Sequence, residues 1–136
     1  MTASNVVIAL VLFAVLACQS TQTARDPIWG KQPCAHCHML LSDPHSAAQV
    51  LAPDAEPLYF DDVGCLVEYL QHTPPASDHA WVRDANGNWL RAASAKYAAK
   101  QNTPMGYGYS VRATGELDFN AVRTLLAREV TKGRAP

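Results

Sequence analysis

Charge is scarce in this sequence and is not biased toward either sign. Eleven Lys and Arg residues stand against twelve Asp and Glu residues, which gives the 136-residue chain a formal net charge of −1. Without an excess of basic side chains, the chain has no electrostatic footprint for nucleic acid or for an acidic membrane surface. We therefore expect no nucleic-acid partner. A content of 49% apolar residues also excludes a wholly disordered chain.

Long apolar runs are absent as well. The longest, residues 6–17 (VVIALVLFAVLA), has twelve positions, whereas a membrane-spanning helix needs about 20. A run of this length is typical of a signal peptide. It ends in Val-Leu-Ala before Cys18, which resembles the lipobox of exported bacterial lipoproteins, although the preceding MTASN contains no Lys or Arg. We expect residues 1–17 to be a cleaved signal peptide and Cys18 to carry a lipid anchor.

The chain is too short for a multidomain enzyme, and its four Cys residues are too few for a dense disulfide scaffold. Residues 18–27 are polar and unpatterned, which predicts a flexible, lipid-anchored tether. Residues 28–136 then form one domain, outside the cytoplasm.

Periodicity and turn signals predict an α+β fold for this domain. Apolar residues recur at helical spacing from the capping pair Asp61-Asp62 to Thr73-Pro74-Pro75, and again over residues 118–131. Asn86-Gly87 is a hairpin signal, and helix propensity predicts a further short helix over residues 93–101. Strands are expected over residues 45–52, 57–60, 79–84, 88–92 and 107–113. This order predicts layered α+β packing rather than an alternating βαβ sheet.

The residues with metal-binding chemistry concentrate in PCAHCHM, residues 33–39. Cys34 and Cys37 are separated by two residues, and three more soft or borderline ligands lie beside them: His36, His38 and Met39. Thiolate and thioether sulfur select soft ions such as Cu(I), and Met105 in the turn-like TPMG could add another thioether. The segment therefore predicts a soft-metal site.

Four other interpretations of the Cys-x-x-Cys pair stay open. CAHCH matches the attachment motif of a c-type haem, with His38 and Met105 as axial ligands of an electron carrier. Structural zinc would need a second Cys/His pair at a usual spacing, and Cys65 with His72 or His79 is a poor substitute for one. A thioredoxin-like redox site would need a helix after the motif, which residues 38–44 do not predict. A disulfide between Cys34 and Cys37 could simply stabilise a structural lipoprotein.

Several motifs occur together in an order that resembles one family. They are PCAHCHMLLSDPHSAAQV, FDDVGCLVEYL, WVRD, WLRAASAKY and TPMGYGY, which span about residues 26–113. With the lipobox, they resemble the NosL family of accessory proteins for nitrous oxide reductase. The resemblance implies a non-enzymatic, periplasmic, membrane-anchored lipoprotein that binds Cu(I) as a metallochaperone. It also implies two small ββαβ-type halves that share a core.

The family resemblance also implies partners and ligands. The partners would be a copper enzyme of denitrification, such as nitrous oxide reductase, and its membrane maturation machinery. The family's C-x-M element corresponds to Cys37-His38-Met39, and its Pro-Met-Gly element to Pro104-Met105-Gly106. Cys37, Met39 and Met105 are thus the implied Cu(I) ligands. The chain departs from better-known members in having His38 in place of Gly, and Cys65 after the Asp pair.

Some residues have two interpretations. Cys65 lies in the first turn of the expected helix, where the helix dipole favours a thiolate ligand, but its apolar neighbours also suit a core residue. Cys34 could be a further copper ligand, or it could form a disulfide with Cys37 and close the site. The two His residues of the motif are more typical of solvated side chains than of ligands. We expect Asp61 and Asp62 to cap the helix, and four aromatic residues to pack rather than act chemically: Trp81, Trp89, Tyr107 and Tyr109.

Overall fold

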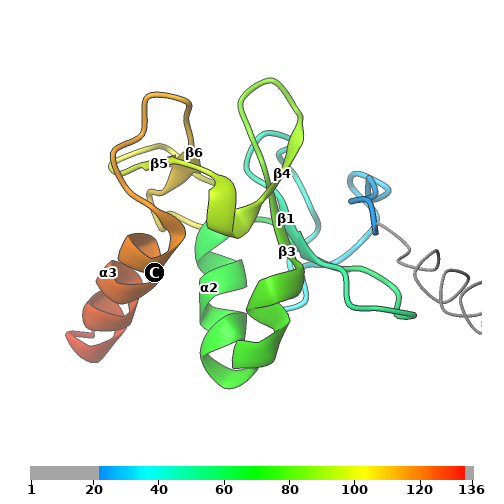
Figure 1. Cartoon of the computed structure of the whole chain (residues 1–136), viewed down its shortest axis with the longest axis horizontal. Helices are drawn as coiled ribbons and strands as arrows, with labels where there is room; N and C mark the ends of the chain where they lie inside the picture. Colours follow the sequence, from blue (N-terminus) through cyan, green and yellow to red (C-terminus); the bar gives the residue numbers. More distant parts are fainter. Residues whose placement is uncertain (1–21, 134–136) are drawn as a thin grey trace, which may run out of the picture.

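A computed structural model describes residues 22–133 (Figure 1). The expected signal peptide, Cys18 and the first residues of the expected tether lie outside the described residues. Over these residues the fold is mixed α/β, with two α-helices, a four-stranded antiparallel sheet and a two-stranded sheet. In chain order the elements are β1 (Ala48–Val50), β2 (Leu58–Phe60), α2 (Val63–His72), the 3-10 helix η1 (Pro74–His79), β3 (Ala80–Arg83), β4 (Trp89–Arg91), the 3-10 helix η2 (Ala92–Ser94), β5 (Tyr97–Ala98), β6 (Ser110–Val111) and α3 (Phe119–Thr131).

The larger sheet has the order β2-β1-β3-β4, with every pair antiparallel. Alternate residues point to its inner face, where Ala48, Phe60 and Val82 are fully buried. Helix α2 packs on this face (Figure 1). The sheet is therefore half of a two-layer core.

Helix α2 confirms the predicted helix after the Asp pair. Its apolar residues at helical spacing are all buried against the core: Val63, Leu66, Val67 and Leu70. Complete burial of each such side chain contributes about 1.5–3 kcal/mol. The Asp62 side chain caps the helix by accepting a hydrogen bond from the N–H of Gly64 at 2.9 Å, and the helix ends before Pro74.

The predicted hairpin at Asn86-Gly87 is confirmed, since it joins β3 to β4. The Asp84 carboxylate accepts hydrogen bonds from the N–H groups of Asn86 and Asn88, both at 2.8 Å. Gly87 has a φ of +82°, which glycine adopts without steric cost. Helix α3 is likewise confirmed over the expected 118–131 segment, with Asp118 as its N-cap.

The helix expected over residues 93–101 is wrong. The segment contains one turn of 3-10 helix, η2, and then the extended strand β5. The reason is tertiary: Tyr97 is fully buried, stacks on Phe119 with ring centroids 5.8 Å apart, and pairs with Leu117 through two backbone hydrogen bonds. These contacts need an extended backbone and override the helix propensity of the alanines. Only two residues of the strand expected over 107–113 are regular, as β6.

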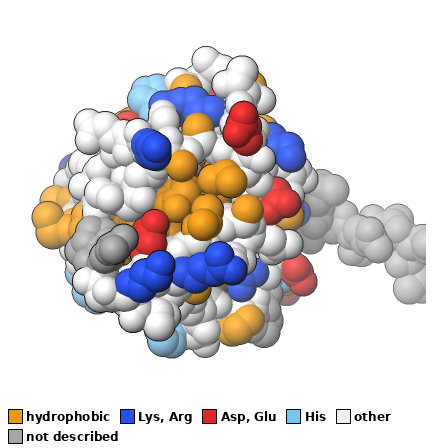
Figure 2. Space-filling model, turned by 90° about the vertical axis from the view of Figure 1, so that its left-hand side faces the viewer, with side chains coloured by type: hydrophobic (Ala, Val, Ile, Leu, Met, Phe, Trp, Pro, Cys, Tyr) orange, Lys and Arg blue, Asp and Glu red, His pale blue; other side chains and the backbone are white. Residues whose placement is uncertain are grey.

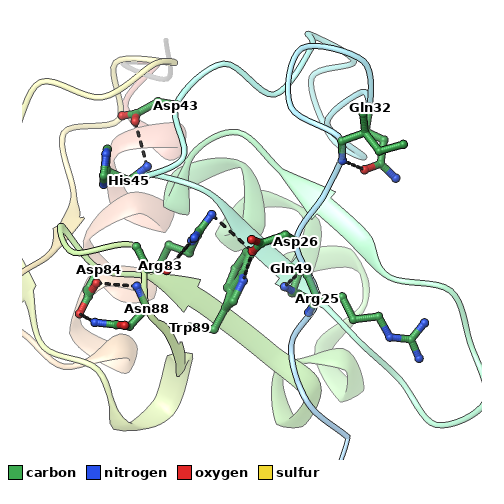
Figure 3. Close-up of polar contacts among 12 residues, drawn as sticks. Arg25, Asp26, Gln32, Asp43, His45, Gln49, Arg83, Asp84, Asn88 and Trp89 are labelled. Carbon is green, nitrogen blue, oxygen red and sulfur yellow. Dashed lines mark hydrogen bonds and ion pairs between the residues drawn. The ribbon is translucent and has the colours of Figure 1, made fainter.

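The structure also differs from the expected free tether over residues 22–27. This segment, which we call the strap, lies along the outer face of the larger sheet (Figure 3). Gln22 donates to the carbonyl of Ala52 at 2.9 Å, and Arg25 exchanges two backbone hydrogen bonds with the side chain of Gln49. Gln49 is fully buried on the central strand β1 and needs partners for its amide, which the strap provides.

The surface agrees with the balanced composition. Figure 2 shows basic and acidic side chains interspersed around a central hydrophobic area on one face of the molecule. Among residues 22–133, no helix has the length and apolar character needed to cross a membrane.

Candidate metal centre

Three cysteines meet at one point of the fold. The Sγ atoms of Cys34, Cys37 and Cys65 all lie within 4.8 Å of one another, and we call this group the thiol cluster. All three are free thiols. Cys34 and Cys65 are fully buried, whereas Cys37 is half-buried. The cluster is thus a compact sulfur site that solvent reaches from the side of Cys37.

A tight loop positions Cys34 and Cys37. Pro33 and Leu40 form an antiparallel bridge, and inside it the N–H of Cys34 donates to the carbonyl of Met39 at 2.8 Å. The N–H of Ala35 donates to the carbonyl of Tyr59 at 2.8 Å, which ties the loop to strand β2. We call residues 33–40 the thiol loop. Its closure directs both cysteine side chains toward the core.

The third thiol comes from helix α2. Cys65 lies in the first turn of the helix, where backbone N–H groups and the helix dipole favour negative charge. The sequence left open whether Cys65 is a ligand candidate or a core residue. The structure gives it both features, because its side chain is fully buried and its sulfur belongs to the cluster.

The three thiols differ in their acidity. The pKa of Cys34 is lowered to about 4, mainly because the Cys65 thiol hydrogen-bonds to it, with backbone N–H groups adding to the effect against burial. That same interaction with Cys34, together with burial, raises the pKa of Cys65. Burial also raises the pKa of Cys37. Cys34 is therefore the most acidic of the three thiols.

The sequence-predicted methionines lie in different surroundings. Met39 is 59% exposed at the end of the thiol loop. Met105 is partly buried against the core, and its N–H donates to the Asp62 carboxylate at 3.1 Å, next to the first turn of α2. The structure thus brings the Met105 segment to the helix that carries Cys65, whereas the side chain of Met39 faces solvent.

The two histidines of the motif are not members of the cluster. His36 is half-buried and His38 is exposed, as expected of solvated side chains. His38 has a φ of +64°, since the loop closes through a hydrogen bond from its N–H to the carbonyl of Cys34. A glycine at this position would adopt that conformation without cost.

Sequence reasoning missed the contact between Tyr107 and Gly64. The Tyr107 ring lies so close to Gly64 that a Cβ on the glycine would be 1.9 Å from the ring's Cγ. Burial, with a smaller contribution from nearby acidic groups such as Glu68 and Asp62, raises the pKa of Tyr107. The sequence signal for this contact is Gly64 itself. Glycine destabilises a helix, so its presence in the first turn of α2 indicates that another group approaches the backbone closely there.

Comparison with known proteins does not identify a relative. No protein-family model matches the chain, and neither the curated proteins nor the solved structures searched give a match. The residues and geometry of the thiol cluster are therefore what indicates the function.

Proposed function

We propose that this protein is an extracytoplasmic, copper(I)-binding lipoprotein that acts as a metallochaperone for a copper enzyme. The single observation that supports it is the thiol cluster, in which three free thiols from two segments lie within 4.8 Å of one another. Soft sulfur ligands in low coordination number suit Cu(I) and discriminate against harder ions.

The cluster needs little rearrangement to bind a metal. With a metal–sulfur distance of about 2.3 Å, three sulfurs around one ion are roughly 4 Å apart. The observed sulfurs are within 4.8 Å of one another, so shifts of less than about 1 Å per pair suffice. Met105 lies on the neighbouring loop and is the candidate for an additional thioether ligand.

The exposure of the thiols supports a carrier that exchanges its cargo. Cys34 and Cys65 are fully buried and would retain the ion, whereas the half-buried Cys37 leaves one side open. The exposed Met39 follows two residues later and would be available to an ion that enters or leaves.

We propose the lipid anchor on Cys18 from the lipobox that precedes it, and the periplasmic location and delivery to nitrous oxide reductase from the resemblance to the NosL family. The order β1, β2, α2, β3 supports the first of the two ββαβ halves that the family implies.

The alternative functions receive less support from the geometry. Attachment of a c-type haem uses both thiols of the motif, and here Cys34 is fully buried beside Cys65. A dithiol oxidoreductase needs its attacking thiol at the surface, whereas Cys34 is fully buried. A purely structural role leaves the convergence of three unpaired thiols unexplained.

An anaerobic Cu(I) titration against a chromophoric chelator tests the proposal. The reduced protein would carry Cys18→Ser, so that this thiol cannot bind copper by itself. We expect one Cu(I) per chain with a Kd well below about 1 μM, and at least tenfold weaker binding for Cys65→Ser. Because Met39 faces solvent, Met39→Leu should have a smaller effect. Failure to bind copper with all three thiols reduced would refute the proposal and favour a haem or structural role.

A further inference from the structure

Two adjacent carboxylates at the start of α2 are almost fully buried. Asp61 is 2% exposed and Asp62 is 0% exposed. Within residues 22–133, the structure gives neither of them a basic partner. Burying a carboxylate without a counter-ion is costly unless hydrogen bonds compensate for the lost water. The hydrogen bonds that do so extend from the pair to two different loops.

Asp61 holds the thiol loop. Its carboxylate accepts a hydrogen bond from the N–H of Ser42 at 2.7 Å and another from the Ser42 hydroxyl at 3.1 Å. Ser42 follows the thiol loop by two residues, and Leu41 between them is fully buried. Asp61 therefore fixes the end of the loop that carries Cys34 and Cys37 against the helix that carries Cys65.

Asp62 holds the Met105 segment. One oxygen caps α2 through Gly64, and the other accepts from the N–H of Met105 at 3.1 Å. The Thr103 side chain is close enough to this carboxylate to lower its pKa, against the larger effect of burial. Thr103 in turn accepts from Gly106 and Gly108, each at 3.1 Å, which closes residues 103–108 into a compact loop.

We infer that Asp61 and Asp62 are positioning residues that hold three segments together: the thiol loop, the first turn of α2 and the Met105 loop. Neither carboxylate belongs to the thiol cluster. That the assembled site binds Cu(I) rests on the proposed function, whereas the positioning of the three thiols by the two carboxylates does not. The sequence predicted that both aspartates cap the helix. Only Asp62 does so, and it uses one of its two carboxylate oxygens for the cap.

Asp118 provides a matched control for Asp62. It is the N-cap of α3 and accepts a hydrogen bond from the N–H of Ala121 at 2.8 Å. Asparagine is as good an N-cap as aspartate. Asp62→Asn and Asp118→Asn should therefore both keep their helix caps. In Asp62→Asn, an NH₂ group replaces the oxygen that accepts the hydrogen bond from the N–H of Met105. Two donors then face each other, which does not happen in Asp118→Asn.

The experiment compares these variants in the full chain carrying Cys18→Ser. One readout is the rate at which a disulfide reagent modifies the three thiols of the metal-free protein, and the other is Cu(I) affinity. We expect Asp62→Asn and Asp61→Ala each to raise the thiol reaction rate at least fivefold and to weaken Cu(I) binding at least tenfold. Asp118→Asn should change both by less than twofold. Ser42→Ala removes the hydrogen bond from the Ser42 hydroxyl to Asp61 but keeps the one from its N–H, so it should give a smaller change in the same direction. This variant tests the role of Asp61 even if Asp61→Ala does not fold.

The outcomes separate the two proposals. Equal behaviour of Asp62→Asn and Asp118→Asn in both readouts would overturn the positioning role of Asp62. Unchanged thiol reactivity in both Asp61→Ala and Ser42→Ala would overturn that of Asp61. If the parent protein binds no Cu(I) but the thiol rates respond as expected, the positioning role stands and the copper-carrier function fails.

Discussion

Because Gly64 has no side chain, the loop of residues 103–108 can pack closely against helix α2. A Cβ there would lie 1.9 to 2.4 Å from three atoms of Tyr107, so the Met105 loop would have to move away from α2. We expect Gly64→Ala to lower the free energy of unfolding by about 1–3 kcal/mol, as overpacking does in cores. Urea unfolding measures this change.

A double mutant identifies the cause of that loss. Combined with Tyr107→Ala, Gly64→Ala should cost little more than Tyr107→Ala alone, since the clash partner is gone. Strictly additive losses would show that Gly64 is needed for some other reason.

His38 has a backbone conformation that its side chain disfavours. An L-residue in the left-handed region costs about 1–2 kcal/mol, whereas glycine adds about 0.4–1 kcal/mol of entropy to the unfolded chain. At its φ of +64°, we therefore expect His38→Gly to stabilise the protein by about 0.5–1 kcal/mol. Because His38 lies outside the thiol cluster, Cu(I) affinity should stay within twofold.

The neighbouring histidine is the control for this substitution. His36 is not among the residues with positive φ in the described chain, so His36→Gly should destabilise. A loss of stability in His38→Gly, or a large loss of copper affinity, would contradict the assignment of His38 as a strained, non-ligating residue.

Single residues also show what the sequence could predict about the site. Spacing alone marks Cys34 and Cys37, because both lie in one short segment. The convergence of Cys65 with them depends on where α2 starts relative to the sheet, and no local pattern encodes that distance. Ser42 and Met105 donate hydrogen bonds to Asp61 and Asp62, which are far from them in sequence. Propensity and periodicity do not describe such bonds.

Among the elements, the β3–β4 hairpin depends on one carboxylate (Figure 3). Backbone hydrogen bonds, chiefly that from Asn88, lower the pKa of Asp84 below its ordinary value of 3.8. A lowered folded-state pKa means that the unfolded chain binds the proton more readily. The contribution of Asp84 to stability is therefore complete above its unfolded pKa, and is lost as the pH falls through its folded pKa.

Unfolding experiments over a pH series test this contribution. Asp84→Asn should be less stable than the parent at pH 7 and should approach it below pH 4, where the parent loses the charge. A constant difference between the two proteins from pH 7 to pH 2 would contradict the assignment.

The elements differ in how far sequence determines them. Helices α2 and α3 and the hairpin were predictable because their signals are local: apolar spacing, a capping Asp and Asn-Gly. The segment around β5 was not, because its conformation is set by partners elsewhere. The Cβ that Gly115 lacks would lie 2.5 Å from the Tyr97 backbone, which shows how closely those two chains approach.

At the scale of the whole molecule, the strap joins the start of the described chain to both central strands. Asp26 accepts a hydrogen bond from the indole N–H of Trp89 at 2.8 Å and lies 3.4 Å from the Arg83 guanidinium, which also stacks near the Trp29 and Trp89 rings. Asp26 is 59% exposed, so its ion pair is worth little by itself. We expect Asp26→Ala to cost about 1 kcal/mol, chiefly through the lost hydrogen bond.

Tryptophan fluorescence during urea unfolding reports this loss, together with a shift of the native emission. Trp89→Phe removes the same hydrogen bond from the other side, and the double mutant should therefore lose less than the sum of the two single mutants. Additive losses would mean that the strap is held elsewhere, through Gln22 and Arg25.

The strap also limits the distance between the folded domain and the lipid anchor proposed at Cys18. If Cys18 is lipidated as proposed and the chain were free up to residue 27, nine residues would separate the anchor from the domain, about 30 Å when extended. Because Gln22 is already bound to the sheet, Cys18 could lie no farther than about 13 Å from the domain, the reach of four residues of chain. The domain would then diffuse in a thin layer at the bilayer surface. An acceptor embedded in the same membrane would meet it by a two-dimensional search at high effective concentration, whereas a freely diffusing acceptor would gain no such advantage.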